Sequence, residues 1–390
     1  MNVVQSVWGK FHHFHLARQL EQRGVLKAIY STYPRRVLRN QGLPYEKIKT
    51  FPWLHTLLIG KWKLHWRNSW VDRALARWMV ITFDQFLSRS VRECDILISL
   101  SGSGLGTARL VKQRGGKYIC DRSSSHIRYG DMLLKEEFAR WGQSYLGTDT
   151  FHILREEEEY ELADVVTVPS EFARSSFLKM GLQENKVRKI PFGADLTRFQ
   201  KVADPPMNEF VVLFVGQVSF RKGVPYLLEA FSKFKFPRKK LIVVGSLLPE
   251  MKKFLQDKRF ENVEFLGTRP HATLKEFMSK SHVMVLPSIE EGLAYVQGEA
   301  MACGCPLISS ANTGASDLFE HGREGFIVPI RDVNAIVDKL NALAEDTGLR
   351  QSMSEAALKR VRDLKGWDTY GEQFFSLCTE LYQNEGTGNT

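Results

Sequence analysis

The second half of the chain alternates between short apolar runs and helical stretches, and this alternation limits the fold more than any other feature. The apolar runs fall at Val211–Val215, Leu241–Val244, Val263–Leu266, Val283–Leu286, Leu307–Ser309 and Phe326–Val328. Continuous apolar runs of this length are typical of strands that are buried on both faces. Strands separated by helices predict a parallel, doubly wound α/β sheet.

The first half contains a second set of such runs. They lie at Val3–Val7, Asp95–Leu100, Lys117–Cys120, Val165–Val168 and Val187–Ile190. A length of 390 residues also favours two domains. The polar, proline-containing stretch 201–206 has the composition of a linker. We therefore expect one domain over residues 1–200 and another over 207–365, followed by a final helix over 367–383.

The composition limits which binding partners and which cellular compartment we expect. The formal net charge of +10 predicts an anionic partner such as a nucleotide, a phosphate or an acidic lipid. The five cysteines are odd in number and lack zinc-ligand spacing, so we expect reduced thiols in a cytoplasmic protein. The start of the sequence lacks the pattern of a signal peptide, and no apolar run has membrane-spanning length. No nucleic-acid-binding motif accompanies the charge, so we do not expect nucleic acid as a partner.

An acidic loop follows the predicted strand that ends at Leu286. Glu291 lies in this loop, and Glu299 lies in the helix that we expect between Gly292 and Gly304. Each carboxylate can accept two hydrogen bonds side by side, which suits the vicinal diol of a sugar. A helix N-terminus also suits a phosphate. The alternative is a solvated acidic helix start, because acidic residues are common there.

Several motifs together resemble the retaining glycosyltransferases of family 4, also called glycosyl transferases group 1. The strongest is the spacing of Glu291 and Glu299 followed by Ala-Met-Ala-Cys-Gly. The others are Phe214-Val215-Gly216 with Arg221-Lys222-Gly223, the segments 168–172 and 190–195, Asn312-Thr313-Gly314-Ala315 and Gly325-Phe326-Ile327-Val328-Pro329. The resemblance is dense from about residue 160 to 345. It implies a GT-B architecture, in which two Rossmann-like domains face each other across a cleft and the last helix crosses back to the first domain.

The resemblance also implies a role for each matching residue. Arg221 and Lys222 would neutralise the donor diphosphate, Glu291 would hold hydroxyls of the donor sugar, and Glu299 would hold the ribose. Close backbone contact with the donor would come from Gly216, Gly292, Leu293 and Ala294. Because the leaving phosphate helps to take the acceptor proton in this family, no enzyme nucleophile is expected. Asp-x-Asp does not occur in the sequence, so we expect neither a metal nor a cofactor beyond the nucleotide-sugar substrate.

Two parts of the first domain are weaker matches. The loop after the first strand keeps Gly9 but carries Lys10, His12 and His13 where the family is usually glycine-rich. Gly9 and Lys10 are candidate donor-binding residues, whereas packing or surface positions are the alternative for the histidines. His126 follows a predicted strand, at the edge where ligands bind in open α/β sheets. It matches by place the cleft histidine of many family members, with a purely structural role as the alternative.

Residues 49–92 combine tryptophan with positive charge. They contain eight Lys or Arg, two Asp and five of the eight tryptophans. Trp62, Trp66 and Trp70 recur on one face of a helix. Basic residues beside tryptophan suit a membrane interface. The alternative is an aromatic stripe packed into the core.

Two further stretches have structural interpretations. Ser101 to Gly106 predicts a tight turn between a strand and a helix, because its glycines miss the dinucleotide-binding spacing. The run 155–161 predicts the start of a helix whose carboxylates form a solvated face.

The expected function is therefore metal-independent, retaining hexosyl transfer from a nucleoside-diphosphate sugar to a glycan or lipid-linked acceptor. The expected process is cell-envelope polysaccharide or glycolipid synthesis. The expected location is the cytoplasm, with peripheral contact to the anionic inner face of the membrane. A nucleotide-sugar epimerase of the same fold, or a non-catalytic sugar-nucleotide binder, are the alternatives.

Overall fold

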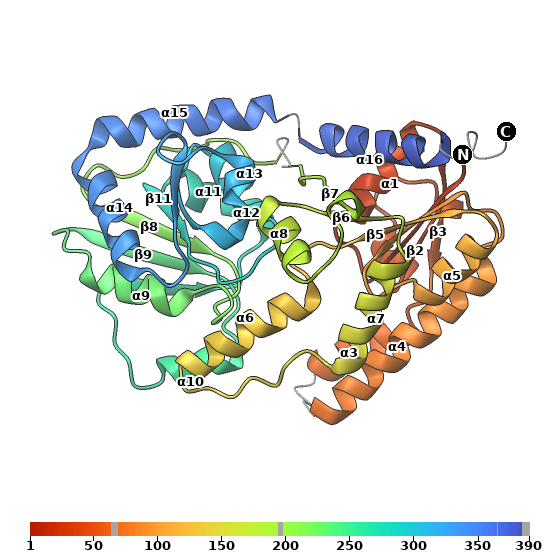
Figure 1. Cartoon of the computed structure of the whole chain (residues 1–390). Helices are drawn as coiled ribbons and strands as arrows, with labels where there is room; N and C mark the ends of the chain where they lie inside the picture. Colours follow the sequence, from red (N-terminus) through yellow and green to blue (C-terminus); the bar gives the residue numbers. More distant parts are fainter. Residues whose placement is uncertain (64–68, 194–197, 365, 384–390) are drawn as a thin grey trace.

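The computed structural model describes residues 1–63, 69–193, 198–364 and 366–383. The described chain forms two α/β domains that lie side by side, each built on one parallel sheet (Figure 1). The prediction of two doubly wound, Rossmann-like domains is confirmed.

The first domain has a seven-stranded sheet in the order β3-β2-β1-β4-β5-β6-β7. Its strands are β1 Val3–Val7, β2 Leu26–Ser31, β3 Ile48–Thr50, β4 Ile96–Leu100, β5 Lys117–Asp121, β6 Val165–Val168 and β7 Val187–Lys189. Its helices are α1 His13–Gln22, α2 Arg35–Leu38, α3 Trp53–Lys63, α4 Ser69–Ser90, α5 Leu105–Gln113, α6 Ile127–Arg140, α7 Thr150–Leu162 and α8 Glu171–Lys179, with short 3-10 turns η1 Tyr45–Lys47 and η2 Glu184–Lys186. The order reverses between β1 and β4, and ligands of such sheets bind at the carboxyl ends beside such a reversal.

The second domain has a six-stranded sheet in the order β10-β9-β8-β11-β12-β13. Its strands are β8 Phe210–Val215, β9 Lys239–Val244, β10 Val263–Gly267, β11 Val283–Leu286, β12 Leu307–Ser310 and β13 Gly325–Val328. Its helices are α9 Val224–Lys233, α10 Pro249–Leu255, α11 Leu274–Ser279, α12 Tyr295–Ala302, α13 Ala315–Leu318, α14 Val333–Glu345 and α15 Thr347–Asp363, with 3-10 turns η3 His271–Thr273 and η4 Ala311–Thr313. The apolar runs of the sequence became these strands because both sheet faces are covered by helices.

The last helix, α16 (Gly366–Gln383), lies on the first domain beside α1, next to the N-terminus (Figure 1). Gln19 of α1 donates a hydrogen bond to Asp368 at 2.8 Å, and His15 stacks on Trp367 with ring centroids 3.9 Å apart. Gly371 lets the two helices approach closely, because a Cβ there would lie 2.4 Å from Cγ of Gln19. The chain therefore leaves the second domain at α15 and ends on the first.

The two domains also touch through α6. Trp141, just after this helix, stacks near Phe220 of the second domain at a centroid distance of 6.2 Å. Arg331 of the second domain reaches back to Glu137 of α6 at 2.7 Å. Apolar and charged contacts thus fix one domain against the other.

One expectation about the first domain is wrong. Helix α7 begins at Thr150, and two carboxylates of the acidic run are buried rather than solvated, with Glu156 8% and Glu159 0% exposed. Glu159 accepts hydrogen bonds from the backbone N–H groups of Gly102 and Gly104, and burial raises its pKa to about 8. Glu159 is needed inside because the tight turn after β4, which the sequence did predict, leaves N–H groups without strand partners. Glu156 instead accepts hydrogen bonds from the side chains of Arg122 and Tyr160.

The tryptophans of residues 49–92 that the structure describes are at the surface. Trp53 is 69% exposed, Trp70 78% and Trp78 61%. The side chains of Trp62 and Trp66 lie outside the described residues. Among the described residues, no helix combines the length and the apolar character that crossing a membrane requires.

The contact between α16 and α1 can be tested with two helical glycines. Gly371→Ala should lower the free energy of unfolding by about 1–3 kcal/mol, because the added methyl group is forced against Gln19. Gly348→Ala is the matched control. Its Cβ meets its nearest atom at an ordinary 3.4 Å, so it should raise stability by up to about 1 kcal/mol. Urea unfolding followed by circular dichroism measures both, and equal midpoints would contradict the close approach.

Candidate functional site

A deep cleft of about 1420 Å³ lies between the two domains. Its walls come from the start of α1, the loop after β5, the loop between β8 and α9, and the loop that leads into α12. The sequence-predicted residues that line it are Lys10, Gly216, Arg221, Lys222, Glu291, Gly292, Leu293, Ala294 and Glu299. The structure therefore brings together residues that the chain supplies from three separate loops and from helix α12.

Glycines place the cationic loop of the second domain. Gly216 directly follows β8 and has φ +155°, a backbone conformation that residues with side chains rarely adopt. Gly223 has φ +65°, and a Cβ there would lie 1.9 Å from the carbonyl oxygen of Pro287. Only glycine permits this contact, which holds Arg221 and Lys222 against the end of β11. Because β8 and β11 are neighbours in the sheet, the cationic and acidic loops meet at one edge.

The two cations are paired with the two carboxylates of the acidic loop. Arg221 Nε lies 2.9 Å from Glu290 Oε2, and Lys222 Nζ is in direct contact with Glu291. Arg221 Nη2 is 3.8 Å from Glu291. Burial raises the pKa of Glu290, but the charge of Arg221 and hydrogen bonds from Ser125 outweigh it and lower that pKa overall. Glu290 is therefore ionised at neutral pH.

The acidic loop is pressed against the first domain. A Cβ on Gly292 would lie 1.8 Å from the carbonyl oxygen of Ser123, so only glycine fits. Ser125 donates from its backbone N–H and from its hydroxyl to Glu290, at 3.2 and 2.6 Å. The hydroxyl of Ser170 donates to the carbonyl of Gly292. These contacts join the domains directly beneath the cleft.

Glu299 lies one turn into α12, the helix that follows this loop. Its side chain is 12% exposed, and Oε1 is 2.9 Å from Nε2 of His271. The helix N-terminus between Ala294 and Tyr295 opens on the cleft, and it offers backbone N–H groups and a partial positive charge to an anion. A phosphate between the cationic loop and this helix end would have Glu291 and Glu299 within reach of flanking hydroxyls.

Two predicted residues are not brought to the cleft wall. His126 is 3% exposed, caps the N-terminus of α6, and packs between Tyr160 and Phe177 at centroid distances of 5.0 Å. Burial lowers its pKa to about 4, so the ring is neutral. Gly9 donates its N–H to Thr32 and lies under the ring of Tyr33, away from the cleft lining. His126 thus has the structural position that the sequence left open as its alternative.

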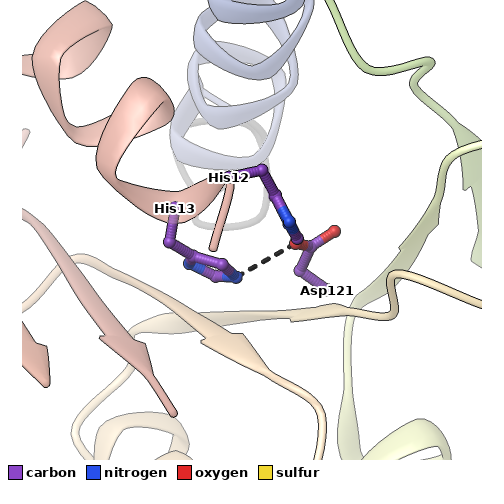
Figure 2. Close-up of side chains that lie close together, drawn as sticks. All are labelled: His12, His13 and Asp121. Atoms are coloured by element: carbon purple, nitrogen blue, oxygen red, sulfur yellow. Dashed lines mark hydrogen bonds and ion pairs between the residues drawn. The ribbon is translucent and has the colours of Figure 1, made fainter. Parts of the chain in front are cut away.

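The structure instead brings His12, His13 and Asp121 together (Figure 2). His12 directly precedes α1 and His13 begins it, whereas Asp121 is the last residue of β5. Asp121 Oδ2 lies 2.5 Å from Nε2 of His12 and 3.1 Å from Nε2 of His13. Two features of the sequence could have indicated this cluster. One is an acidic residue at the carboxyl end of a predicted strand, and the other is the pair of histidines after the first strand.

These three side chains are of types that can bind a metal, but their spacing is that of hydrogen bonds. Two ligands at about 2.0–2.2 Å from one tetrahedral ion lie well over 3 Å apart. The His12–Asp121 pair is closer than that. Burial lowers the pKa of His13, and the two histidines together lower the pKa of Asp121 although its burial opposes them. The cluster is therefore an ionised carboxylate that accepts from imidazole.

The chain that builds this cleft resembles known proteins in sequence. Residues 196–360 match the family described as Glycosyl transferases group 1. An uncharacterized glycosyltransferase of Methanocaldococcus jannaschii is 26% identical over 66% of this chain and 69% of that protein. The capsular polysaccharide biosynthesis glycosyltransferase CapM of Staphylococcus aureus is 27% identical over 57% of this chain and 63% of its own length.

Among solved structures, HepE of Anabaena in complex with UDP-glucose superposes with a TM-score of 0.67 at 17% identity, covering 97% of this chain and all of that one. That likeness extends over both domains and the crossing helix, so it bears on the fold of the whole chain. The matched segment holds the cationic loop and both cleft carboxylates, so the likeness to the group 1 glycosyltransferases covers the donor side of the cleft. The structural likeness shows that the whole chain has the GT-B fold.

Proposed function

We propose that this protein is a retaining, metal-independent glycosyltransferase that moves a sugar from a nucleoside-diphosphate sugar to an acceptor hydroxyl. The observation that carries the proposal is the placement of Arg221 and Lys222 opposite Glu291 at the N-terminus of α12, all lining one cleft. CapM is a glycosyltransferase of capsular polysaccharide biosynthesis, which supports a polysaccharide product, and the complex of HepE with UDP-glucose supports a UDP-linked donor. We place the activity in cell-envelope polysaccharide or glycolipid synthesis.

The two ion pairs of the cleft indicate how a donor would bind. Without donor, Lys222 is neutralised by Glu291 and Arg221 by Glu290. A diphosphate offers Lys222 a stronger partner, which frees Glu291 to accept hydrogen bonds from sugar hydroxyls. As the bond to the sugar breaks, negative charge grows on the leaving diphosphate, and both cations stabilise it without a metal. Glu299 would hold the ribose diol.

The cationic loop gives the first test of this function. Lys222→Ala should lower kcat by about 10²-fold or more, because one preorganised charge that stabilises the leaving group is lost. Arg221→Ala should do the same and should also lower the melting temperature, because buried Glu290 then loses its partner. Lys253→Ala, exposed on α10, is the control. Turnover assays with the preferred donor and acceptor measure all three, and normal rates in both cleft variants would refute the assignment.

The two carboxylates should differ in what they bind. Glu299→Gln should weaken binding of the free nucleotide as well as the nucleotide sugar, because this residue would touch the ribose. Glu291→Gln should leave free nucleotide binding nearly unchanged and impair sugar transfer. Each lost charged hydrogen bond is worth about 1.5–3 kcal/mol. Calorimetric titration with the free nucleotide separates the two, and equal losses of affinity would show that the division is wrong.

We also propose that the enzyme works at an anionic membrane surface. Three exposed tryptophans, Trp53, Trp70 and Trp78, on α3 and α4 support this, because buried rings would favour the alternative of a core stripe. Arg73 and Arg77 are engaged by the loop before α7, so the charge available for lipid must come from other residues of this region. Lys61, Lys63 and Arg67 are the candidates in the sequence.

Vesicle flotation tests this proposal. The protein should float with anionic but not neutral vesicles at low salt, because basic residues attract acidic lipid at about 1 kcal/mol each. Trp53→Glu with Trp78→Glu should abolish flotation and leave the melting temperature unchanged, since both residues are exposed. Met207→Glu changes another exposed apolar side chain, outside α3 and α4, and serves as the control. Failure of the unmodified protein to bind anionic vesicles would contradict membrane contact.

A further inference from the structure

The first-domain side of the cleft differs in charge from the side that would hold the donor. Among the described residues that line the cleft, the carboxylates are Glu291 and Glu299, and both belong to the second domain. Each of them contacts a basic side chain of its own domain. The described lining residues of the first domain include Lys10 and Arg18 but no carboxylate. The wall opposite the donor site is therefore cationic.

We propose that this wall binds a phosphate group of the acceptor, and that Lys10 and Arg18 recognise it. The acceptor is then a phosphorylated carbohydrate, either a soluble sugar phosphate or a sugar carried on a lipid diphosphate. This inference rests on the proposed glycosyl transfer and names the chemical class of its second substrate.

The cleft has room for a second substrate beside the donor. Its volume of about 1420 Å³ exceeds the roughly 300–1,000 Å³ of a pocket for one small molecule. The loop with Arg221 and Lys222 and the N-terminus of α12 would bind the donor diphosphate from the second domain. The acceptor would then lie against the first domain, whose lining includes the loop after β1, helix α1 and residues 40–42.

Lys10 is presented to the cleft by a loop with an unusual backbone. Gly9 has φ +70°, and Phe11 has φ +23°, where a residue with a side chain is strained. The N–H of Gly9 donates to the hydroxyl of Thr32, which anchors the start of the loop. Lys10 and Phe11 are both exposed and both line the cleft. Among the described residues, Lys10 Nζ forms no hydrogen bond or ion pair, so its charge is available to a ligand.

Arg18 is held in place before any ligand binds. Nη1 donates to the carbonyl of Gln41 at 2.9 Å, and Nη2 donates to Nδ1 of His15 at 2.7 Å. Both of these acceptors are neutral, because an imidazole nitrogen that accepts carries no proton. The ring of His15 is itself fixed by its stacking on Trp367. Gly42 has φ +69° and packs on the aliphatic stem, since a Cβ there would lie 3.2 Å from Cδ of Arg18. These contacts orient the guanidinium and bring no negative charge to it.

A phosphate matches this pair of cations better than a single carboxylate does. A phosphate monoester has a charge of about −1.5 to −2 at neutral pH, which one lysine and one arginine together balance. Arginine offers a planar fork of donors and lysine a point charge, and both are frequent partners of phosphate. Asp121, behind His12, is only 3% exposed and accepts hydrogen bonds from His12 and Thr167, so it is not part of the wall. The alternative is that Lys10 reaches across the cleft to the donor diphosphate.

Inorganic pyrophosphate is the probe for this site. It is titrated by calorimetry into protein already saturated with UDP, GDP or ADP, whichever binds, so that the donor phosphate site is filled. The unmodified protein should bind one pyrophosphate more. Lys10→Ala should weaken that binding by about tenfold or more, and Lys10→Arg should restore it to within about threefold, because the charge returns. Lys135→Ala, on the exposed face of α6 and outside the cleft lining, is the matched control and should have no effect.

Arg18→Lys tests the second cation without removing its charge. Lysine lacks the planar fork of donors, so pyrophosphate should bind about threefold to tenfold more weakly. Unchanged pyrophosphate affinity in this variant would show that the guanidinium does not contact the phosphate, and the assignment of Arg18 would be wrong.

Affinity for the free nucleotide separates an acceptor site from a donor site. In Lys10→Ala this affinity should change less than about threefold, because the nucleotide would be held by the second domain. If it falls about tenfold instead, Lys10 belongs to the donor site and the inference is overturned. It is also overturned if the unmodified, nucleotide-saturated protein binds no pyrophosphate. If the unmodified protein binds no nucleotide at all, the proposed function itself is refuted.

Transfer assays distinguish the two sources of the phosphate. Three acceptors with the same hexose are compared, namely the hexose 1-phosphate, the hexose on an alkyl diphosphate and the neutral alkyl hexoside. The better phosphorylated acceptor should have a kcat/KM at least about tenfold above that of the neutral one, and Lys10→Ala should remove most of this preference by raising KM. Preference for the alkyl diphosphate indicates a lipid-linked acceptor, and preference for the hexose 1-phosphate indicates a soluble one. Equal use of neutral and phosphorylated acceptors by the unmodified protein would contradict the inference.

Discussion

The buried carboxylate of Glu290 connects the two domains, and the cleft depends on it. One oxygen accepts from the backbone and hydroxyl of Ser125 in the first domain, and the other pairs with Arg221 in the second. A buried charge of this kind is costly to isolate, so the three groups hold one another in place. The next residue, Glu291, faces the cleft. Two consecutive carboxylates thus have different positions, since Glu290 joins the domains and Glu291 lines the cleft.

This arrangement also supports our proposal that an anionic ligand with hydroxyl groups binds in the cleft. Arg221 and Lys222 are already positioned before a ligand binds, because Gly223 holds their loop against the end of β11. Their charge is balanced by Glu290 and Glu291 until a stronger partner arrives. A diphosphate can take up Lys222, while hydroxyl groups of a sugar can take up the released carboxylate. A ligand that offers only a diphosphate or only hydroxyl groups would leave either Lys222 or Glu291 without a partner.

The sequence predicted those parts that follow from local pattern. Apolar runs located the strands, and parallel strands imply that the loops with Arg221 and Glu291 meet at one sheet edge. The pair His12–Asp121 could not be predicted in this way, because its members are 109 residues apart and meet only through the order β1-β4-β5. Nor could the burial of Glu159 be foreseen, since the need for it arises from unpaired N–H groups in a distant turn. His126 stood at the expected edge, yet packing turned its ring inward.

Direct binding of a nucleotide sugar is the measurement that bears most closely on the role of this cleft. Isothermal titration calorimetry of the unmodified protein against UDP-, GDP- and ADP-sugars should show one-to-one binding of at least one donor. Added divalent metal should not be required, and affinity should fall as salt rises, because the contact is between charges. If none of these donors binds, or if binding appears only with a divalent cation, the cleft is not the metal-independent donor site that we propose.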